Sequence, residues 1–512
     1  MRLYRQAFPG DDVSTTATPL ARDNPRLVWT TALVVAALGA WIMFDAMPGL
    51  NWGIWTAAAS TGLFVVARDR GTLDGSLLLI LAAAVVLAAG AGVTADPMLH
   101  GFICLAVMLS LSLAMLLATA PYFRRITAPF VIASPFVAAG NAAGESFRRL
   151  VDLSGKPRSA RARATLRGFA ITIPIVFFFA LLLASADPVF AIWRDQVARI
   201  ISTWSFIPRM IFFCVLLVIA LGAYSYAARE PAPKVTEPGI VAGSSDRRLG
   251  GTERLILVSS ITALFWLFIA VQLSYLFGNA PSVPGSKMSF AEYAQRGFGE
   301  LSIVATLSVL LIVLTERYGQ LNGHAKRLKF ITLALLLAVA IMLASAFHRV
   351  QLYEAAYGYT VSRLYAQAYM LVLAAGLAAL TFEVMATVDT GRLFRRVFAM
   401  AAAAFIVLVF WNHEAWIADE NIDRSIATGK ELDVSYLVGN LSPNAVPVVV
   451  SRLATIPEPI QNELRQALAH QYGSSRRLRN DRWFEWNFRR QEARSALAEI
   501  GIKPALAKPP AD

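Results

Sequence analysis

The chain has 512 residues, of which 56% are hydrophobic and only 16% are charged, and its mean hydropathy is +0.54. Soluble domains are usually about 45–50% apolar and about 25% charged, so this composition excludes an ordinary cytosolic enzyme, a disordered chain and a collagen-like chain. The formal net charge is +13, but the basic residues stand beside apolar segments, where membrane topology explains them better than nucleic-acid binding does.

Apolar segments of about 20 residues, the length that crosses a bilayer as a helix, recur through the chain. The sequence predicts eleven spans, at residues 27–47, 50–67, 75–94, 100–120, 166–186, 207–227, 254–277, 299–316, 329–348, 364–387 and 396–415. The predicted fold class is therefore all-α, a polytopic helical transmembrane bundle. We expect residues 1–26 to form a cytoplasmic N-terminal segment and the first span to be retained, because no small-residue cleavage site follows it.

Two connecting segments have a distinct composition. Residues 127–143 are apolar but short, contain Pro129 and Pro135, and lie between two pairs of arginines. We interpret them as an interfacial or re-entrant segment, because a crossing here would move every later loop to the other side and reverse the charge bias. Residues 228–252 are rich in Pro, Gly and Ser, which is typical of a flexible cytoplasmic connector.

The distribution of Lys and Arg between loops predicts the orientation. Basic residues gather after every second span, whereas the loops at 46–50 and 95–99 contain none. Short cytoplasmic loops carry the excess of Lys and Arg, so the N-terminus is expected in the cytoplasm. An odd number of spans then places the C-terminus on the extracytoplasmic side.

Residues 416–512 differ in composition from the spans and predict a small all-helical extracytoplasmic tail. Gly429 and Gly473 are typical helix stops, and Ser442 followed by Pro443 is typical of a helix start. The tail carries a run of arginines that is either a solvated surface or a contact with anionic lipid headgroups. Nucleic acid is not an expected partner on this side of a membrane.

Ionisable residues within or beside spans are costly and indicate functional sites. Four groups of them, after spans 5, 9 and 11 and before span 8, are predicted to lie at the same extracytoplasmic face. We expect them to converge on one polar vestibule, whose candidate residues are Asp187, Glu292, Tyr293, Arg296, Glu300, His348, Arg349, Tyr353, Glu354, Tyr357, Arg363 and His413.

Two interpretations of this vestibule remain open. Glu292, Arg296 and Glu300 recur every fourth residue, so they would line one face of a helix, and Arg349 and Tyr353 are likewise one turn apart. Carboxylates, guanidinium groups and phenols together could hold a polar headgroup or a sugar. Alternatively, the acids and arginines pair with one another at helix ends, and the tyrosines form the aromatic belt of the interface.

Recognisable catalytic and cofactor motifs are not found in the sequence. The two cysteines lie inside apolar runs, and His413-Glu414 does not continue as a zinc motif because position 417 is Ile. The sequence contains no phosphate-binding loop, nucleophile elbow or dinucleotide fingerprint in a fitting context. We therefore expect no metal, no cofactor and no ATP-driven transport by this chain alone.

Several segments resemble a known family. They are Leu-Leu-Ala-Ser-Ala-Asp-Pro-Val-Phe at 182–190, Glu-Tyr-Ala-Gln-Arg-Gly-Phe-Gly-Glu-Leu at 292–301, the run from Arg349 to Tyr365, Asn-Ile-Asp at 421–423 and Leu-Ser-Pro-Asn-Ala-Val-Pro at 441–447. Together they resemble the domain of unknown function 4173 family of bacterial polytopic proteins, although Tyr359 stands where that pattern has Leu. The resemblance implies a bacterial inner-membrane protein and implies no activity.

Three classes of function remain open from the sequence. The first is a non-enzymatic membrane protein that uses the vestibule for transport, lipid handling or signalling, with the lipid bilayer and a lipid or envelope ligand as partners. The second is an integral-membrane transferase acting on a lipid-linked envelope substrate. The third is a scaffold that recruits partners through its tail and the 228–252 loop. The sequence does not identify a protein partner.

Overall fold

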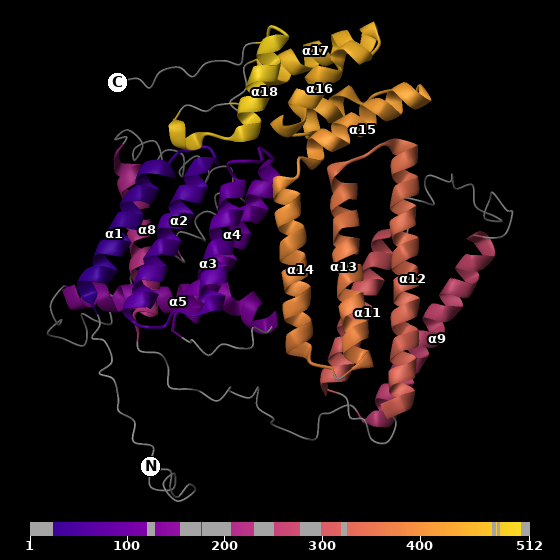
Figure 1. Ribbon diagram of the computed structural model, residues 1–512, viewed down its shortest axis with the longest axis horizontal. Helices are drawn as coiled ribbons and strands as arrows, with labels where there is room; N and C mark the ends of the chain where they lie inside the picture. The colour runs from indigo at the N-terminus through magenta and orange to yellow at the C-terminus, as the bar shows by residue number, and fades with distance from the viewer. Residues whose placement is uncertain are drawn as a thin grey trace, which may run out of the picture.

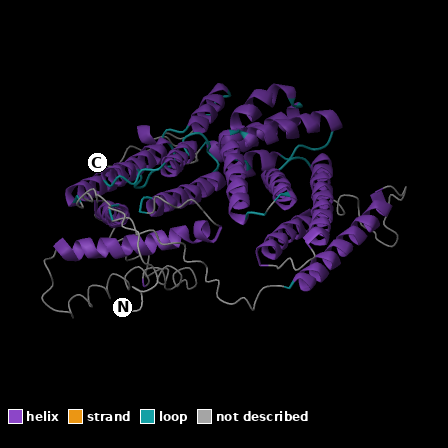
Figure 2. Ribbon diagram, turned by 60° about the horizontal axis from the view of Figure 1, so that its bottom comes forward, coloured by secondary structure: helices purple, strands orange, loops and turns teal. Residues whose placement is uncertain are grey.

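The computed structural model describes residues 24–119, 128–153, 206–229, 250–276, 298–318, 325–386, 388–473 and 482–502, together with residues 176 and 478. Within these residues the elements are helices joined by loops, and Figure 2 shows no strand among them. Long helices stand side by side and shorter C-terminal helices lie across one end of them (Figure 1). The prediction of an all-α polytopic bundle is confirmed. Apart from residue 176, the predicted span at 166–186 lies outside the described residues.

The N-terminal half of the bundle contains six described helices. They are α1 (Pro25–Ile42), α2 (Leu50–Asp69), α3 (Gly75–Gly90), α4 (Pro97–Leu117), α5 (Ala128–Leu153) and α8 (Phe206–Ala227). Asn24 and Asp96 cap α1 and α4, and a proline follows each of them at the first helical position, where its missing N–H costs nothing. Helix α5 lies across the end of this half in Figure 1 and is not among the helices apolar enough to span.

The C-terminal half is built around one long helix. Its described helices are α9 (Gly251–Leu276), α11 (Phe298–Tyr318), α12 (Ala325–Tyr357), α13 (Val361–Met385) and α14 (Thr390–Phe410). Helices α9, α11 and α13 all pack against α12, whose Leu335, Leu336 and Val339 are buried in their common core. Among the described helices, nine across the two halves are long and apolar enough to cross a membrane. The protein is therefore an integral membrane protein.

The two halves meet where α14 packs against α3 and α4. Val409 of α14 is buried together with Leu87 and Ile103. A Cβ atom placed on Gly90 would lie 2.2 Å from a methyl group of Val409, so this approach requires a glycine. Helices in lipid commonly pack through close contacts at small residues. Lipid tails are as apolar as the side chains, so burying apolar side chains between helices gives no hydrophobic driving force.

The structure differs from two of the predicted helix boundaries. Helix α14 ends at Phe410, because Trp411 is extended and Asn412 caps a new helix through its side chain, which accepts from the N–H of Ala415. Helix α12 continues beyond the predicted span as far as Tyr357. It ends at Gly358, whose φ of 88° only glycine adopts readily.

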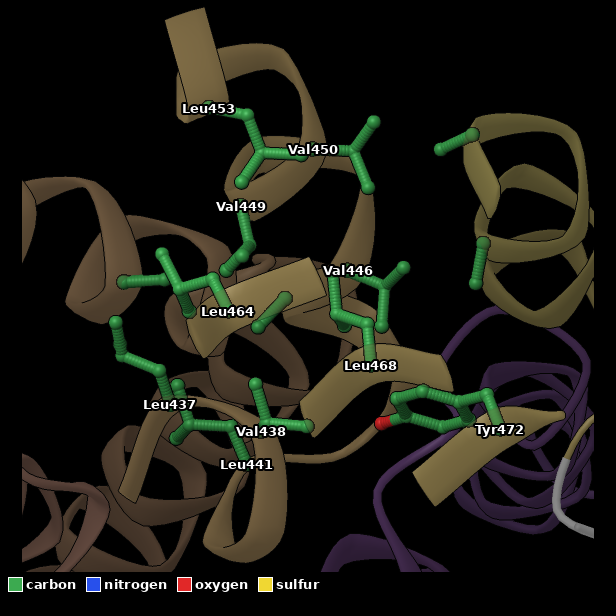
Figure 3. Packing of buried hydrophobic residues seen from close by; sticks show 14 of the residues in the cluster. Leu437, Val438, Leu441, Val446, Val449, Val450, Leu453, Leu464, Leu468 and Tyr472 are labelled. Atoms are coloured by element: carbon green, nitrogen blue, oxygen red, sulfur yellow. The ribbon is translucent and has the colours of Figure 1, made fainter. Parts of the chain in front are cut away.

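Residues 413–473, 478 and 482–502 form a compact unit across one end of the bundle, which we call the cap (Figure 1). Its elements are α15 (His413–Thr428), η2 (Tyr436–Asn440), η3 (Pro443–Ala445), α16 (Val446–Arg452), η4 (Leu453–Thr455), α17 (Glu458–Tyr472), η6 (Trp483–Glu485) and α18 (Phe488–Glu499). Side chains of η2, α16 and α17 point into one apolar core, around Leu464 and Leu468 (Figure 3). Gly429 ends α15 in the left-handed conformation, as its position in the sequence predicts.

The cap holds the loops of the N-terminal half through backbone and amide hydrogen bonds. Where the α1–α2 loop enters α2, the N–H of Leu50 donates to the carbonyl oxygen of Trp486 at 3.0 Å. In the α3–α4 loop, the side chain of Asn487 donates to the carbonyl oxygens of Ala91 and Thr94, at 2.9 and 2.6 Å. These contacts satisfy peptide groups that the helix ends leave without partners.

The cap holds the α12–α13 loop in the same way. The side-chain amide of Asn421 accepts from the N–H of Tyr359 and donates to its carbonyl oxygen, both at 2.8 Å. The hydroxyl of Tyr436 accepts from the N–H of Val361 at 2.9 Å. One small domain therefore binds loops from both halves of the bundle.

Replacing Asn487 with Ala should release the cap from the α3–α4 loop. The Asn487 side chain is fully buried, and its oxygen also caps α18 by accepting from the N–H of Arg490. Losing this N-cap and both amide bonds to the loop should destabilise the folded protein by about 2 kcal/mol, and the ring of His100, 3.2 Å from the Ala91 carbonyl oxygen, should limit the loss. A lower melting temperature and faster proteolysis of the cap would be measured on the detergent-solubilised protein. Gln491→Ala, at an exposed position of the same helix, should change neither, and equal effects of both variants would contradict this role.

Candidate functional site

The predicted vestibule residues that the structure describes lie toward the cap, but they do not form one group. Asp187, Glu292, Tyr293 and Arg296 lie outside the described residues. Glu300 is exposed in the first turn of α11, His348 is exposed on α12, and Arg349 is half-buried. The remaining five residues divide between two clusters, which are separated by the first turns of α13.

The first cluster joins the ends of α12 and α13. The side-chain amide of Gln367 donates to Glu354 at 2.6 Å, and Glu354 is only 4% exposed. The guanidinium group of Arg363 lies 4.1 Å from the centre of the Tyr353 ring, and the Tyr353 and Tyr357 rings are in tilted contact, with centroids 4.8 Å apart. Arg363 and Gln367 are one turn apart, so both face α12. Arg363 therefore contacts an aromatic ring. Of the two interpretations of the vestibule, neither the acid–arginine pairs nor the open ligand site predicts this contact.

The second cluster lies where both halves of the bundle meet the cap, and we call it the junction network. Its members are Thr94, Asp96, Tyr365, His413, Glu414, Ser442 and Asn444. The hydroxyl of Tyr365 lies 3.1 Å from Oδ2 of Asp96 and 3.2 Å from Nε2 of His413. Tyr365 stands between Arg363 and Gln367 in sequence and faces the α3–α4 loop instead of α12. A single helix therefore positions side chains of both clusters.

Glu414 is the acceptor around which the rest of the junction network is arranged. Its Oε1 accepts from the N–H of Ser442 at 2.9 Å, and its Oε2 accepts from the Ser442 hydroxyl and from the Asn444 amide at 2.8 Å. The same Asn444 amide group donates to Thr94 at 3.0 Å, and its oxygen accepts from the N–H of Ala95 at 2.8 Å. Asn444 therefore bridges the cap and the N-terminal half.

Burial governs the electrostatics of the junction network. Burial raises the pKa of Glu414 to about 7, with a further increase from the negative charge of Asp96, while the bonds from Ser442 and Asn444 oppose the shift. Burial lowers the pKa of His413, and the backbone carbonyl of Trp411 acts in the opposite direction. In the described part of the chain no Lys or Arg forms an ion pair with Asp96 or Glu414.

The carboxylates at the other end of the bundle are held differently. Glu383 accepts from Arg392 at 2.7 Å and from Arg396 at 2.8 Å, so it is a paired helix-end residue. Arg254 and Glu316 form a buried ion pair between α9 and α11. No group of three His, Cys, Asp or Glu residues among the described positions could hold a metal ion.

An apolar groove of about 550 Å³ lies between α12 and α13, directly below the first cluster. Its floor is made by the buried side chains Leu336, Leu343, Met370 and Leu377. Its walls include four alanines at 340, 344, 374 and 378, which leave the space open. His348 and Gln351 line its end near the cap, one turn from Glu354.

Sequence reasoning missed Asp96, Ser442, Asn444 and Gln367 as members of these clusters. Asp96 precedes Pro97 between two apolar runs, which indicates a helix cap and gives no sign of a distant partner. Ser442 and Asn444 belong to the segment 441–447 that carries part of the family resemblance. The resemblance carried by that segment was the available signal.

The family model described as a domain of unknown function (DUF4153) matches residues 79–451, which run from α3 into α16. The match covers well over half of the chain, so the chain belongs to this family. It includes both clusters and the groove, and it ends before η6 and α18. No curated protein and no solved structure matches the chain. The match does not confirm the 4173 family that the sequence resembles.

The raised pKa of Glu414 predicts that the stability of the cap depends on pH. A carboxyl group whose pKa rises from 4.5 to about 7 on folding stabilises the folded state fully below pH 4.5. That contribution, on the order of 3 kcal/mol, is lost as the pH rises through the folded pKa. The denaturant concentration at which half of the cap is unfolded should therefore decrease as the pH is raised from acidic to neutral.

Glu414→Gln provides the test, because an amide does not ionise. In this variant the fall in stability between acidic and neutral pH should be greatly reduced, whatever the absolute stability of the variant. Glu431→Gln changes an exposed carboxylate of the cap and should leave the fall unchanged. A fall of wild-type size in Glu414→Gln would show that another group causes it.

Proposed function

We propose that this member of the DUF4153 family is a non-enzymatic membrane protein that binds a lipid between α12 and α13. The observation that carries the proposal is the apolar groove, whose polar end lies beside the first cluster. Among the functions that the sequence leaves open, lipid handling is the one for which the described residues provide both an apolar and a polar part of a site.

The dimensions of the groove suit an acyl chain. From Met370 to Thr381 the groove extends along α13, a distance of about 17 Å at 1.5 Å per residue. One leaflet occupies about half of the 30 Å hydrocarbon core of a bilayer, so the groove is about as long as one leaflet is thick. The walls are exposed at Leu337 and Leu371, which would let a lipid enter sideways from the bilayer.

The end of the groove near the cap suits a polar headgroup. His348 and Gln351 supply hydrogen-bonding groups at the mouth, and the Glu354–Gln367 pair lies one turn further toward the cap. The Tyr353 and Tyr357 rings lie at the same level, where aromatic side chains commonly contact headgroups. An amphiphile would therefore place its tail against leucine and alanine and its headgroup against amide and imidazole groups.

The charge of the loops at one end of the bundle supports an orientation of the protein. The end away from the cap carries the Lys and Arg residues Arg68, Arg70, Arg229, Lys326, Arg327, Arg392, Arg395 and Arg396. Lys and Arg in short loops concentrate on the cytoplasmic side, so the basic loops at this end support a cytoplasmic N-terminus and an extracytoplasmic cap, which has arginines of its own on a separate folded unit. The resemblance to the 4173 family supports a bacterial inner membrane. The lipid would then come from the outer leaflet.

Filling the groove should displace the lipid. Ala378→Phe places a ring between the walls of the groove, and it should lower the apparent affinity for lipid at least about tenfold. The measurement is the phospholipid that co-purifies with the detergent-solubilised protein, quantified by mass spectrometry.

The matched control is Ala402→Phe, which adds the same ring to an exposed position of α14 outside the groove. It should leave the bound lipid at the wild-type level. Equal amounts of lipid on wild type and on Ala378→Phe, with both proteins folded, would contradict the proposal.

The proposed orientation makes a separate prediction. In a variant whose Cys104 and Cys214 are replaced by Ala, a single cysteine at exposed Gln466 of α17 should react with a membrane-impermeant maleimide in intact cells. A single cysteine at Asp69, at the other end of the bundle, should react only after the membrane is permeabilised. The opposite pattern would place the cap in the cytoplasm.

A further inference from the structure

We propose that Asp96, Tyr365 and His413 together form a proton-binding site, which holds one proton and passes it between the carboxylate and the imidazole through the tyrosine hydroxyl. The site lies in the junction network, away from the groove, and the proposal does not depend on the lipid-binding function. It follows from counting the donors and acceptors of the three side chains.

The hydroxyl of Tyr365 has two partners and one hydrogen. It lies 3.1 Å from Oδ2 of Asp96 and 3.2 Å from Nε2 of His413. A phenol donates one hydrogen bond and accepts others. If Tyr365 donates to Asp96, then His413 must donate to Tyr365, and if Tyr365 donates to His413, then Asp96 must donate to Tyr365.

The other nitrogen of His413 decides how many protons the chain needs. Nδ1 of His413 lies 3.3 Å from the carbonyl oxygen of Trp411, which can only accept. Nδ1 must therefore carry a hydrogen, and a neutral imidazole has no second one for Nε2. All three bonds form only when one proton is added to the pair of an ionised Asp96 and a neutral His413.

The added proton has two positions within the site. In one state Asp96 is a neutral acid that donates from Oδ2 to Tyr365, and Tyr365 donates to Nε2 of His413. In the other state Tyr365 donates to the Asp96 carboxylate, and Nε2 of the imidazolium donates to Tyr365. The states interconvert when Oδ2 gives its proton to the Tyr365 oxygen while Tyr365 gives its own to Nε2, so protons and charge balance.

The surroundings of the site favour retention of this proton. Asp96 is 5% exposed and His413 is 1% exposed, and an uncompensated carboxylate at such a position is costly. Oδ1 of Asp96 already accepts from the N–H of Met98 at 2.8 Å, which leaves Oδ2 for the proton. Burial lowers the pKa of His413, which favours the state with the proton on Asp96.

The other titratable groups that face the site come from four elements. Asp96 is faced by His100 of α4 and Glu414 of α15. Glu414 is faced by Tyr436 of η2, and His100 is faced by Arg490 of α18. Arg490 donates to the carbonyl oxygens of Pro48 and Glu485. None of these groups supplies the hydrogen that the chain from Asp96 through Tyr365 to His413 requires.

The test is nitrogen NMR of the full-length protein labelled at histidine and held in lipid nanodiscs. The signal of His413 is identified by its loss in His413→Gln. In the wild type Nδ1 should carry a hydrogen throughout the interval between about pH 5 and 8, in which an ordinary histidine titrates. A neutral His413 with its hydrogen on Nε2 would overturn the proposal.

Asp96→Asn distinguishes a shared proton from a local property of His413. Asparagine retains the capping oxygen for Met98 and supplies a permanent donor to Tyr365, so His413 should stay neutral with its hydrogen on Nδ1 and should no longer titrate. Asp389→Asn makes the same change at the N-cap residue of α14, at the other end of the bundle. It should leave the His413 titration as in wild type.

Tyr365→Phe covers the case in which Asp96→Asn fails to fold. Removing the hydroxyl should break the hydrogen-bonded chain between Asp96 and His413. The midpoint pH of the His413 titration should therefore shift from its wild-type value, and a further change of Asp96 to Asn should no longer alter it. An unchanged His413 titration in the folded Asp96→Asn or Tyr365→Phe variant would overturn the proposal.

Discussion

Peptide groups at the ends of membrane helices need hydrogen-bond partners where water is scarce, and in this protein side-chain amides of the cap provide them. Asn487 donates to two carbonyls of the α3–α4 loop, Asn421 pairs with both backbone groups of Tyr359, and Asn444 accepts from Ala95. An amide suits this task because it donates and accepts without a charge that would have to be desolvated. These three side chains hold the α3–α4 and α12–α13 loops, and with them the residues of both clusters, against the cap.

The two ends of the bundle solve the same problem with different chemistry. At the end away from the cap, Glu383 and Glu316 are paired with arginines, so their charge is compensated by an ion pair. At the cap end, Asp96 and Glu414 are surrounded by hydroxyl, amide and imidazole groups in the described residues. Burial without a neighbouring cation raises the pKa of Glu414 to about 7. Glu414 therefore makes the cap end sensitive to moderate changes of pH.

The sequence predicts the helices well and the clusters poorly, for a physical reason. A span is encoded by consecutive apolar residues, and the punctuation at Gly429 and at Ser442-Pro443 acts within a few residues, so both can be recognised locally. The bond between Tyr365 and Asp96 joins residues 269 positions apart, and no local pattern encodes it. The groove depends on which alanines of α12 and α13 face each other, which the composition of two uniformly apolar helices does not reveal. The predicted vestibule residues that the structure describes lie toward the cap, as the charge of the loops predicts, but their division between two clusters comes from tertiary packing.

The first two turns of α13 carry Arg363 and Gln367 on one face and Tyr365 on another. Because these three side chains share one rigid backbone, a rotation of α13 about its own axis moves all three together. Any twist that draws Gln367 away from Glu354 and widens the mouth of the groove also swings the phenol of Tyr365 relative to Asp96 and His413. The binding of the proposed lipid and the binding of the proposed proton would then affect each other through two turns of α13, without a shared atom.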